Sequence, residues 1–518
     1  MANSTSRWLA FARILIGTTM LAAAAKAAEP DNTQILLDLL VKRGVLSASD
    51  AAAYAKQIQA PAAAAPAQMS ASANAAPANA PVLTSAASSQ ASPLSFKIGI
   101  ADFTPFGFMD FTTLYRSTLN GGDIGSSFGS IPYGNTANGQ LSETRFSAKN
   151  SRLGLRVDST VGDTKVLGYV ETDFLGNAAT NINVASNSDV MRMRVYFVDL
   201  RNGDWEFLAG QDWSLMTPNR KGLSPVPGDI FYTQNVDTNY QVGLVWGRTP
   251  QLRAIYHASD EWTAGISLEN PDQYVGSAVT LPAGFTTTQV DTGSNGTATP
   301  NVFPDVIGKI AYDTKLGDLP LHVDAATLIR YFKINTYTST VDANASKTGI
   351  GGSVNANLSV MPNLQLIGNF FDGNDGGRYL STGLGPDFIV NPVNSSGAYS
   401  LSLVNSYSGL GGLEWDVTPM SKVYGYYGMV KYGQKYDQLT ASSYVGYGYP
   451  GSSNSNNKQI EEYTIGLTQT LWKNPRYGDL KVLFQASYVD RQPWYVAPAA
   501  PSKAHLGMVY VDLRYDLP

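Results

Sequence analysis

The chain has 518 residues, a formal net charge of −5 and no cysteine. The lack of thiols excludes a disulfide framework, Cys-based zinc sites and cysteine nucleophiles, and the mild acidity offers no basic stripe for a nucleic acid. Only 15% of the residues are charged, Gly is abundant at 49, and Tyr outnumbers Phe by 29 to 19. This composition is typical of a chain with many short strands, tight turns and interfacial tyrosines.

Residues 1–28 have the pattern of a secretory signal peptide. Arg7 and Arg13 flank the start of an apolar run from Ile14 to Ala25, and small residues follow at a plausible cleavage point. The run is shorter than the ~20 residues that a spanning helix needs, so a retained anchor is the less favoured alternative. No later window is long and apolar enough for a spanning helix. If this protein lies in a membrane, it must cross as strands.

Residues 29–60 are predicted to form two short periplasmic helices. Asn32 or Thr33 can cap the first, and Ser47 with Asp50 resembles a capping box for the second. Helices this short are weak without partners, so three alternatives remain: self-association, packing on peptidoglycan or another periplasmic partner, and a mostly frayed pair. Residues 61–93 are rich in Ala and Pro and predict a disordered linker, because they cannot bury enough apolar surface to offset their ordering entropy.

Residues 94–518 carry alternating segments separated by turn signals. The expected strands lie near 97–117, 143–158, 163–176, 189–200, 204–213, 239–258, 261–270, 303–314, 319–334, 346–361, 363–373, 398–418, 421–435, 458–473, 478–491 and 504–516. An even number of strands, each about 10 residues or longer, is typical of an outer-membrane barrel. The fold class predicted is all-β, a 16-stranded antiparallel transmembrane β-barrel with a short N-terminal periplasmic α-helical segment.

The connections between these segments alternate between short and long. Short ones such as 161–162 and 201–203 alternate with long ones such as 118–142 and 214–238. A barrel whose two rims face different compartments shows this alternation, whereas a soluble sandwich has no reason to keep it.

Apolar and charged residues fall on opposite faces of the strands. In the stretch Val190 to Ser214, Met191 to Phe197 at alternate positions are expected to face lipid, while Arg192 and Arg194 face the lumen. A Lys or Arg facing lipid near the midplane would cost about 2–4 kcal/mol, so the charged face must look inward. Other apolar sets expected to face lipid include Leu153, Leu155 and Val157; Val242, Leu244 and Trp246; and Val509, Val511 and Leu513.

Several segments together resemble a known family, the Gram-negative outer-membrane porins, and in particular the DcaP-like and phosphate-selective kinds. They are the head LLDLLVKRGVLSASDA before the Ala/Pro linker, NSRLGLRV, YVETDF, MRMRVYFVDL, and WEFLAGQDWSLMTP before a Pro/Gly-rich loop. One departure is the C-terminus, which ends Tyr515-Asp516-Leu517-Pro518 where this class usually ends on an aromatic residue.

The resemblance implies a homotrimer in the cell outer membrane, with the N-terminal segment in the periplasm. It also implies a constriction loop after the fifth strand, here about 214–238. The function expected is a porin, a water-filled channel for passive diffusion of small hydrophilic solutes. Its expected partners are outer-membrane lipid, lipopolysaccharide and small anionic solutes, with no nucleic acid and no cofactor. The alternative is a structural or adhesive envelope barrel tethered through its N-terminal helices.

Lumen charges set the ion preference of a pore, so they are the candidate site. Arginines gathered on one wall would enrich anions such as carboxylates or phosphate. The candidate lumen residues are Arg145, Arg152, Arg156, Arg192, Arg194, Lys309 and Arg330. The candidate constriction-loop residues are Asp212, Arg220, Lys221 and Asp229. The competing interpretation is that the arginines pair with Glu171, Asp173 and Glu206 and only brace the barrel.

Neither an enzyme nor a metal site is expected. His257, His322 and His505 are far apart and none has a metal-binding spacing. The segment from Asp372 to Gly377 lacks the register and the closing glutamate of an EF-hand, so an extracellular turn is expected there. The glycines around Leu410 lie inside a predicted strand, where they favour bending or close packing.

Overall fold

The computed structural model describes residues 92–518 except 122, 177–189, 294–295 and 381–382. The predicted signal peptide, helical segment and most of the linker lie outside the described residues and stay predictions. The barrel forms one compact unit of the chain. None of the described helices is long and apolar enough to cross a bilayer.

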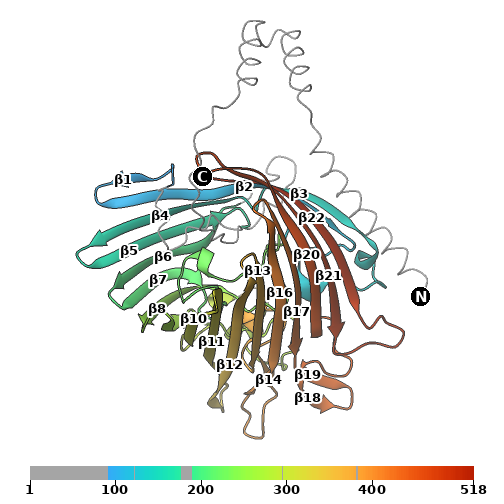
Figure 1. Cartoon of the computed structure of the whole chain (residues 1–518). Coiled ribbons are helices and arrows are strands. Elements are labelled where there is room, and N and C mark those ends of the chain that lie inside the picture. The colour runs from blue at the N-terminus through green and yellow to red at the C-terminus, as the bar shows by residue number, and fades with distance from the viewer. Residues whose placement is uncertain (1–91, 122, 177–189, 294–295, 381–382) are drawn as a thin grey trace, which may run out of the picture. The chain divides into compact units, whose positions relative to one another are not determined.

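The sheet consists of antiparallel strands that follow one another in chain order (Figure 1). The strands of its first half are β1 (Phe96–Ile98), β2 (Ala101–Arg116), β3 (Glu143–Ser147), β4 (Arg152–Val161), β5 (Thr164–Asp173), β6 (Arg192–Asn202), β7 (Trp205–Trp213), β8 (Arg248–His257), β9 (Trp262–Glu269) and β10 (Asp305–Leu316). Those of its second half are β11 (Leu319–Tyr337), β12 (Asp342–Met361), β13 (Leu364–Gly373), β16 (Ser406–Thr418), β17 (Ser421–Tyr432), β20 (Asn457–Asn474), β21 (Gly478–Pro493) and β22 (Ala504–Asp516).

The sheet closes on itself. β22 pairs with β2 from Phe108↔Asp516 to Arg116↔Met508, and Figure 1 shows the red last strand beside the blue first one. β1 is a short strand folded back on β2, and β3 continues the line of β4 along β2. Of the 18 strands in the sheet, these two are accessory, so the barrel has 16 antiparallel strands, as predicted.

The two ends of the barrel differ in loop length. Tight turns join the strands at one end, and the connections at the other end are numbered L1 to L8 in chain order. They comprise L1 (117–142), L2 (174–191), L3 (214–247), L4 (270–304), L5 (338–341), L6 (374–405), L7 (433–456) and L8 (494–503). Within them lie the hairpins β14 (Phe388–Asn391) with β15 (Ser400–Leu403) and β18 (Lys435–Thr440) with β19 (Ser443–Tyr447). The short 3-10 helices are η1 (Phe128–Ser130), η2 (Asn138–Gln140), η3 (Pro227–Asp229), η4 (Thr287–Gln289), η5 (Gly296–Ala298) and η6 (Gly377–Tyr379).

The outer surface of the barrel is apolar. Alternate positions of β7 and β13, among them Phe207, Leu366 and Phe370, expose large hydrophobic side chains. Four exposed tryptophans lie next to tight turns: Trp205, Trp262, Trp415 and Trp472. Apolar bands edged by aromatic side chains are the lipid-facing surface of transmembrane barrels, because an indole ring is most stable at the interface between lipid and water.

A bulge between β5 and β6 corrects one predicted face. Glu171 pairs with Val195 and Thr172 with Met193, so Arg194 is an extra residue without a partner position. The alternation therefore shifts by one after Arg194. Val195 and Phe197 are buried inside the barrel, where lipid contact had been expected, while Val198 and Leu200 are exposed.

Two strand boundaries also differ from expectation. β8 begins at Arg248 and β16 at Ser406, several residues after the predicted starts at 239 and 398. Val242, Leu244 and Trp246 alternate like a strand, but they are buried inside the barrel as part of L3 and do not face lipid. The apolar alternation was wrongly attributed to lipid contact because an apolar segment packed within the lumen produces the same pattern.

Candidate functional site

Loop L3 crosses the lumen and is the element that shapes any path through it. It leaves the end of β7 and reaches the opposite wall, where the Val242 amide donates to Glu462 of β20 at 2.8 Å and Arg220 binds Glu414 of β16 at 2.8 Å. A Cβ built on Gly428 of β17 would overlap the Val242 carbonyl oxygen. Only a glycine there lets the loop backbone touch the wall. The inserted loop is therefore longer than the predicted 214–238.

Four arginines gather where L3 joins the wall, and we call them the arginine wall: Arg152 of β4, Arg192 and Arg194 of β6, and Arg248 of β8. Arg194 donates to Glu171 at 2.6 Å and to Asp173 at 2.8 Å. Arg192 binds Asp173 at 2.7 Å, and Arg152 lies 3.5 Å from Glu171. The predicted pairing with Glu171 and Asp173 thus occurs, whereas Glu206 contacts His257 at 2.9 Å.

Positive charge nevertheless exceeds negative charge in the arginine wall, because it has four guanidinium groups and only two carboxylates, which pair with three of them. The structure describes no ion pair for Arg248, whose guanidinium lies over the Trp213 ring at 5.4 Å and the Trp246 ring at 5.8 Å. Buried nitrogens without an acceptor include Arg152 Nε and Arg248 Nη1. Arg248 was not among the predicted site residues, because it lay within the strand predicted from 239.

The pKa of Tyr240 in L3 is lowered by this excess positive charge. The Tyr240 hydroxyl accepts a hydrogen bond from Arg194 at 3.2 Å. Burial alone would raise the pKa of Tyr240, but the guanidinium groups of Arg194 and Arg248 outweigh burial and lower this pKa below its ordinary value. The arrangement is suited to attract an anion.

The other candidate residues lie apart from the arginine wall. Arg145 binds Glu143 at 2.8 Å and Arg156 binds Asp158 at 2.7 Å. Lys309 is buried, and its amino group donates to the Thr217 carbonyl and the Asn219 side chain of L3 at 2.8 Å each. Asp212 lies 3.3 Å from Arg253, so it does not oppose the cations of L3. Lys221 is exposed, and Asp229 is buried near Ser224 with burial raising its pKa.

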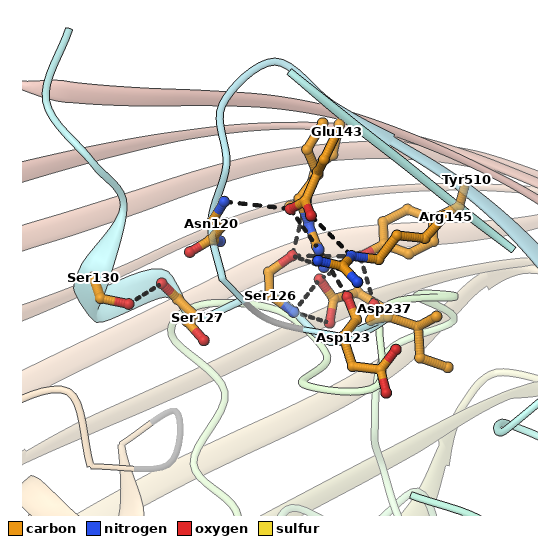
Figure 2. Close-up of polar contacts among 12 residues, drawn as sticks. Asn120, Asp123, Ser126, Ser127, Ser130, Glu143, Arg145, Asp237 and Tyr510 are labelled. Atoms are coloured by element: carbon orange, nitrogen blue, oxygen red, sulfur yellow. Dashed lines mark hydrogen bonds and ion pairs between the residues drawn. The ribbon is translucent and has the colours of Figure 1, made fainter. Parts of the chain in front are cut away.

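Loop L1 is joined to L3 by a network of polar contacts (Figure 2). The Ser126 amide donates to Asp237 of L3 at 3.1 Å, and the Tyr510 hydroxyl of β22 donates to the same carboxylate at 2.9 Å. Arg116 of β2 binds Glu143 at 3.1 Å and donates to the Asp123 carbonyl at 2.8 Å. This network holds the tip of L3 to the seam where the barrel closes.

Arg330 of β11 binds groups of both L4 and L6. Its guanidinium binds Asp305 of β10 at 3.0 Å and Asp387 of L6 at 2.6 Å, and it donates to the carbonyl oxygens of Asp375 at 2.6 Å and Asp272 at 2.7 Å. L6 also meets L3, since the Trp246 amide donates to the Tyr379 carbonyl at 3.0 Å. The β14–β15 hairpin of L6 belongs to a hydrophobic core inside the long-loop end.

Carboxylates outnumber cations around Arg330. The acidic groups are Glu269, Asp272, Asp291, Asp305, Asp375 and Asp387, and the second cation is Arg378, which lies 3.4 Å from Asp305. Burial is the largest cause that raises the pKa of Asp272 to about 7 and that of Asp375 to about 8.

This burial predicts a pH dependence of loop docking. A carboxyl whose pKa is higher in the docked state binds more protons there, so docking weakens as pH rises from the free value of 3.8 to about 8. We expect proteolysis of L4 and L6 in the detergent-solubilised barrel to quicken between pH 6 and pH 9. Asp375→Asn should flatten this pH profile. An identical pH profile in Asp375→Asn and the parent would contradict the prediction.

The histidines take no part in a common site. His322 faces the lumen, as predicted, and lies between Asp313 at 2.9 Å and Asp324 at 3.0 Å. His505 contacts Asp490 at 2.5 Å on the outer part of β22. Within the described ranges, no three His, Asp or Glu side chains are arranged as metal ligands.

The architecture resembles that of solved outer-membrane channels. The chain superimposes on the outer membrane channel DcaP of Acinetobacter baumannii with a TM-score of 0.56, at 18% identity over 80% of this chain and 97% of that one. The chain has a porin fold. An anion-selective porin from Comamonas acidovorans matches with a TM-score of 0.43 at 13% identity, over 80% of this chain and all of that one. No model of a protein family and no curated protein matches the sequence.

This porin fold agrees with the resemblance to DcaP-like porins, and it indicates the outer membrane as the location of the barrel. The apolar band and its tryptophans agree with that location, because a surface of this kind is stable only against lipid.

Proposed function

We propose that the barrel is a porin for passive diffusion of small hydrophilic solutes across the outer membrane, with a preference for anions such as carboxylates or phosphate. The observation that carries the proposal is the arginine wall, in which three of the four guanidinium groups share the carboxylates of Glu171 and Asp173 and that of Arg248 has no described ion pair. A surplus of positive charge beside a narrow path raises the local concentration of anions and repels cations.

The assembly that we propose is a homotrimer embedded in lipid and lipopolysaccharide, with the N-terminal segment in the periplasm and available to peptidoglycan or another partner there. No enzymatic role is part of the proposal. Each of the three histidines is engaged by a carboxylate, which supports a structural role for it.

Zero-current potentials under a tenfold KCl gradient test the anion preference. We expect the full mature protein in a planar bilayer to conduct with chloride favoured over potassium. Arg152→Gln and Arg248→Gln should each shift the potential toward cation selectivity, because each removes a charge from a group that already has more guanidiniums than carboxylates. These two are preferred to Arg194, whose loss would leave two buried carboxylates unpaired.

The matched control is Lys347→Gln, which removes one positive charge from an exposed position of β12. Its potential should equal that of the parent protein. A parent channel that favours potassium, or arginine variants that behave like the control, would overturn the anion preference.

One observation favours the alternative of a structural envelope barrel. L3 spans the lumen, and the β14–β15 hairpin fills part of the long-loop end with apolar side chains. A barrel that is plugged in this way would insert into the bilayer without conducting. The same recording separates the two functions, since a porin gives discrete conductance steps and a plugged barrel gives none.

A further inference from the structure

A small cavity lies between the arginine wall and L3, and its lining is more specific than a general positive charge requires. Its volume is about 30 Å³, room for roughly two waters at about 10–15 Å³ each. Arg152, Arg194 and Arg514 line one side, and Thr233, Asn235 and Tyr240 of L3 line the other. Tyr232 and Thr238, also in the lining, are partly exposed, so the cavity adjoins solvent in the lumen.

Three polar atoms among the lining residues have no hydrogen-bond partner among the residues that the structure describes: Arg152 Nε, Thr233 Oγ1 and Asn235 Oδ1. All three residues are at least nine-tenths buried. Buried polar atoms are rarely left unpaired, because an unpaired atom loses its hydration without a hydrogen bond in return. A site that leaves these atoms free is suited to a ligand that supplies the missing partners.

The chemistry of the three atoms specifies that ligand. Arg152 Nε can only donate, and its charge favours an anionic oxygen as acceptor. Asn235 Oδ1 can only accept, since the amide nitrogen of Asn235 already donates to the Tyr240 carbonyl and to Gln241, both at 3.1 Å. Thr233 Oγ1 can do either. The complement is a small anion that also carries a hydrogen-bond donor.

We infer that this cavity is a selectivity site for small hydroxycarboxylates, with the carboxylate on Arg152 and the hydroxyl between Thr233 and Asn235. This inference rests on the proposed anion channel and deepens it. Glycolate, with two carbons, is the smallest hydroxycarboxylate, and because it is larger than two waters it would extend from the cavity into the adjoining lumen. Acetate has the same charge and carbon number but offers no donor to Asn235, so it leaves that oxygen unpaired.

Bi-ionic potentials with glycolate and acetate salts test the inference. We expect the glycolate-to-acetate permeability ratio to exceed the ratio of the two free mobilities by about two- to tenfold, the effect of one hydrogen bond. Thr233→Val and Asn235→Leu should lower the permeability ratio to the mobility ratio while chloride remains favoured over potassium. Arg152→Gln should reduce the permeability of both acids.

Thr233→Val should keep the fold intact, because valine has nearly the shape of threonine. The hydroxyl that it removes has no partner among the described residues. Asn344→Leu, at an exposed position of β12, is the control for Asn235→Leu and should behave as the parent. A parent ratio equal to the mobility ratio, or a raised ratio that survives both L3 variants, would overturn the hydroxycarboxylate site while anion preference stands. Potassium preference in KCl would instead overturn the proposed function.

Discussion

Replacing Arg330 by glutamine is expected to release L4 and L6 from the wall. The guanidinium of Arg330 is buried and joins β10, L4 and two points of L6. Breaking a buried pair by removing one partner costs about 3–5 kcal/mol, because it leaves the other charge buried and unpaired. Here the residue lost is one of two cations among six carboxylates, so the effect should lie at the upper end of that range.

Limited proteolysis of the folded barrel measures this release. We expect cleavage within L4 and L6 to become much faster in Arg330→Gln, while the heat-dependent gel mobility typical of a closed barrel is kept. Arg378→Gln is the matched control, because Arg378 contacts the same Asp305 from a partly exposed position. Equal cleavage rates in the two variants would show that Arg330 is not the fastening residue.

Replacing Gly428 by valine is expected to displace L3 from the wall. A Cβ at this position would overlap the Val242 carbonyl oxygen, and the Val242 amide is also bound to Glu462. Overpacking costs about 1–3 kcal/mol in a well-packed interior. The loop should move and the strand should stay, because β17 is held by ladders to β16 and β20 on both sides.

Single-channel conductance reports the displacement of L3. We expect Gly428→Val to change the conductance severalfold and to broaden its distribution, because the loop loses its fixed seat on the wall. The control is Gly368→Val in β13, where a Cβ meets no atom within 4 Å. A Gly428→Val channel with the parent conductance would mean that the contact does not set the position of the loop.

The barrel could be predicted from the sequence because its strands obey a rule with period two and its charges cannot face lipid. Trp205 and Phe207 of β7 follow that rule and are exposed. The rule failed after Arg194, because the extra residue in the bulge shifts the alternation of the side chains that follow. The sequence around Arg194 has no glycine that would indicate a bulge.

The arginine wall was only partly predictable. Arg152, Arg192 and Arg194 could be placed by alternation, since each alternates with apolar positions of its strand. Arg248 could not, because Val242 to Trp246 imitate a lipid-facing strand and concealed where β8 begins. The unpartnered atoms of Thr233 and Asn235 result from the tertiary packing of L3, which the sequence pattern does not predict.

The pairing of β2 with β22, which closes the barrel, is expected to form late in folding. Its strands are almost 400 positions apart, as in Thr113↔Val511, so loop-closure entropy makes this pairing a late event. Arg116 and Tyr510, which hold L1 and L3, come from opposite sides of this seam. The opening beside L3 therefore cannot acquire its final shape before the last strand has joined the first. A folding intermediate with an open seam would have its wall largely assembled but no defined aperture.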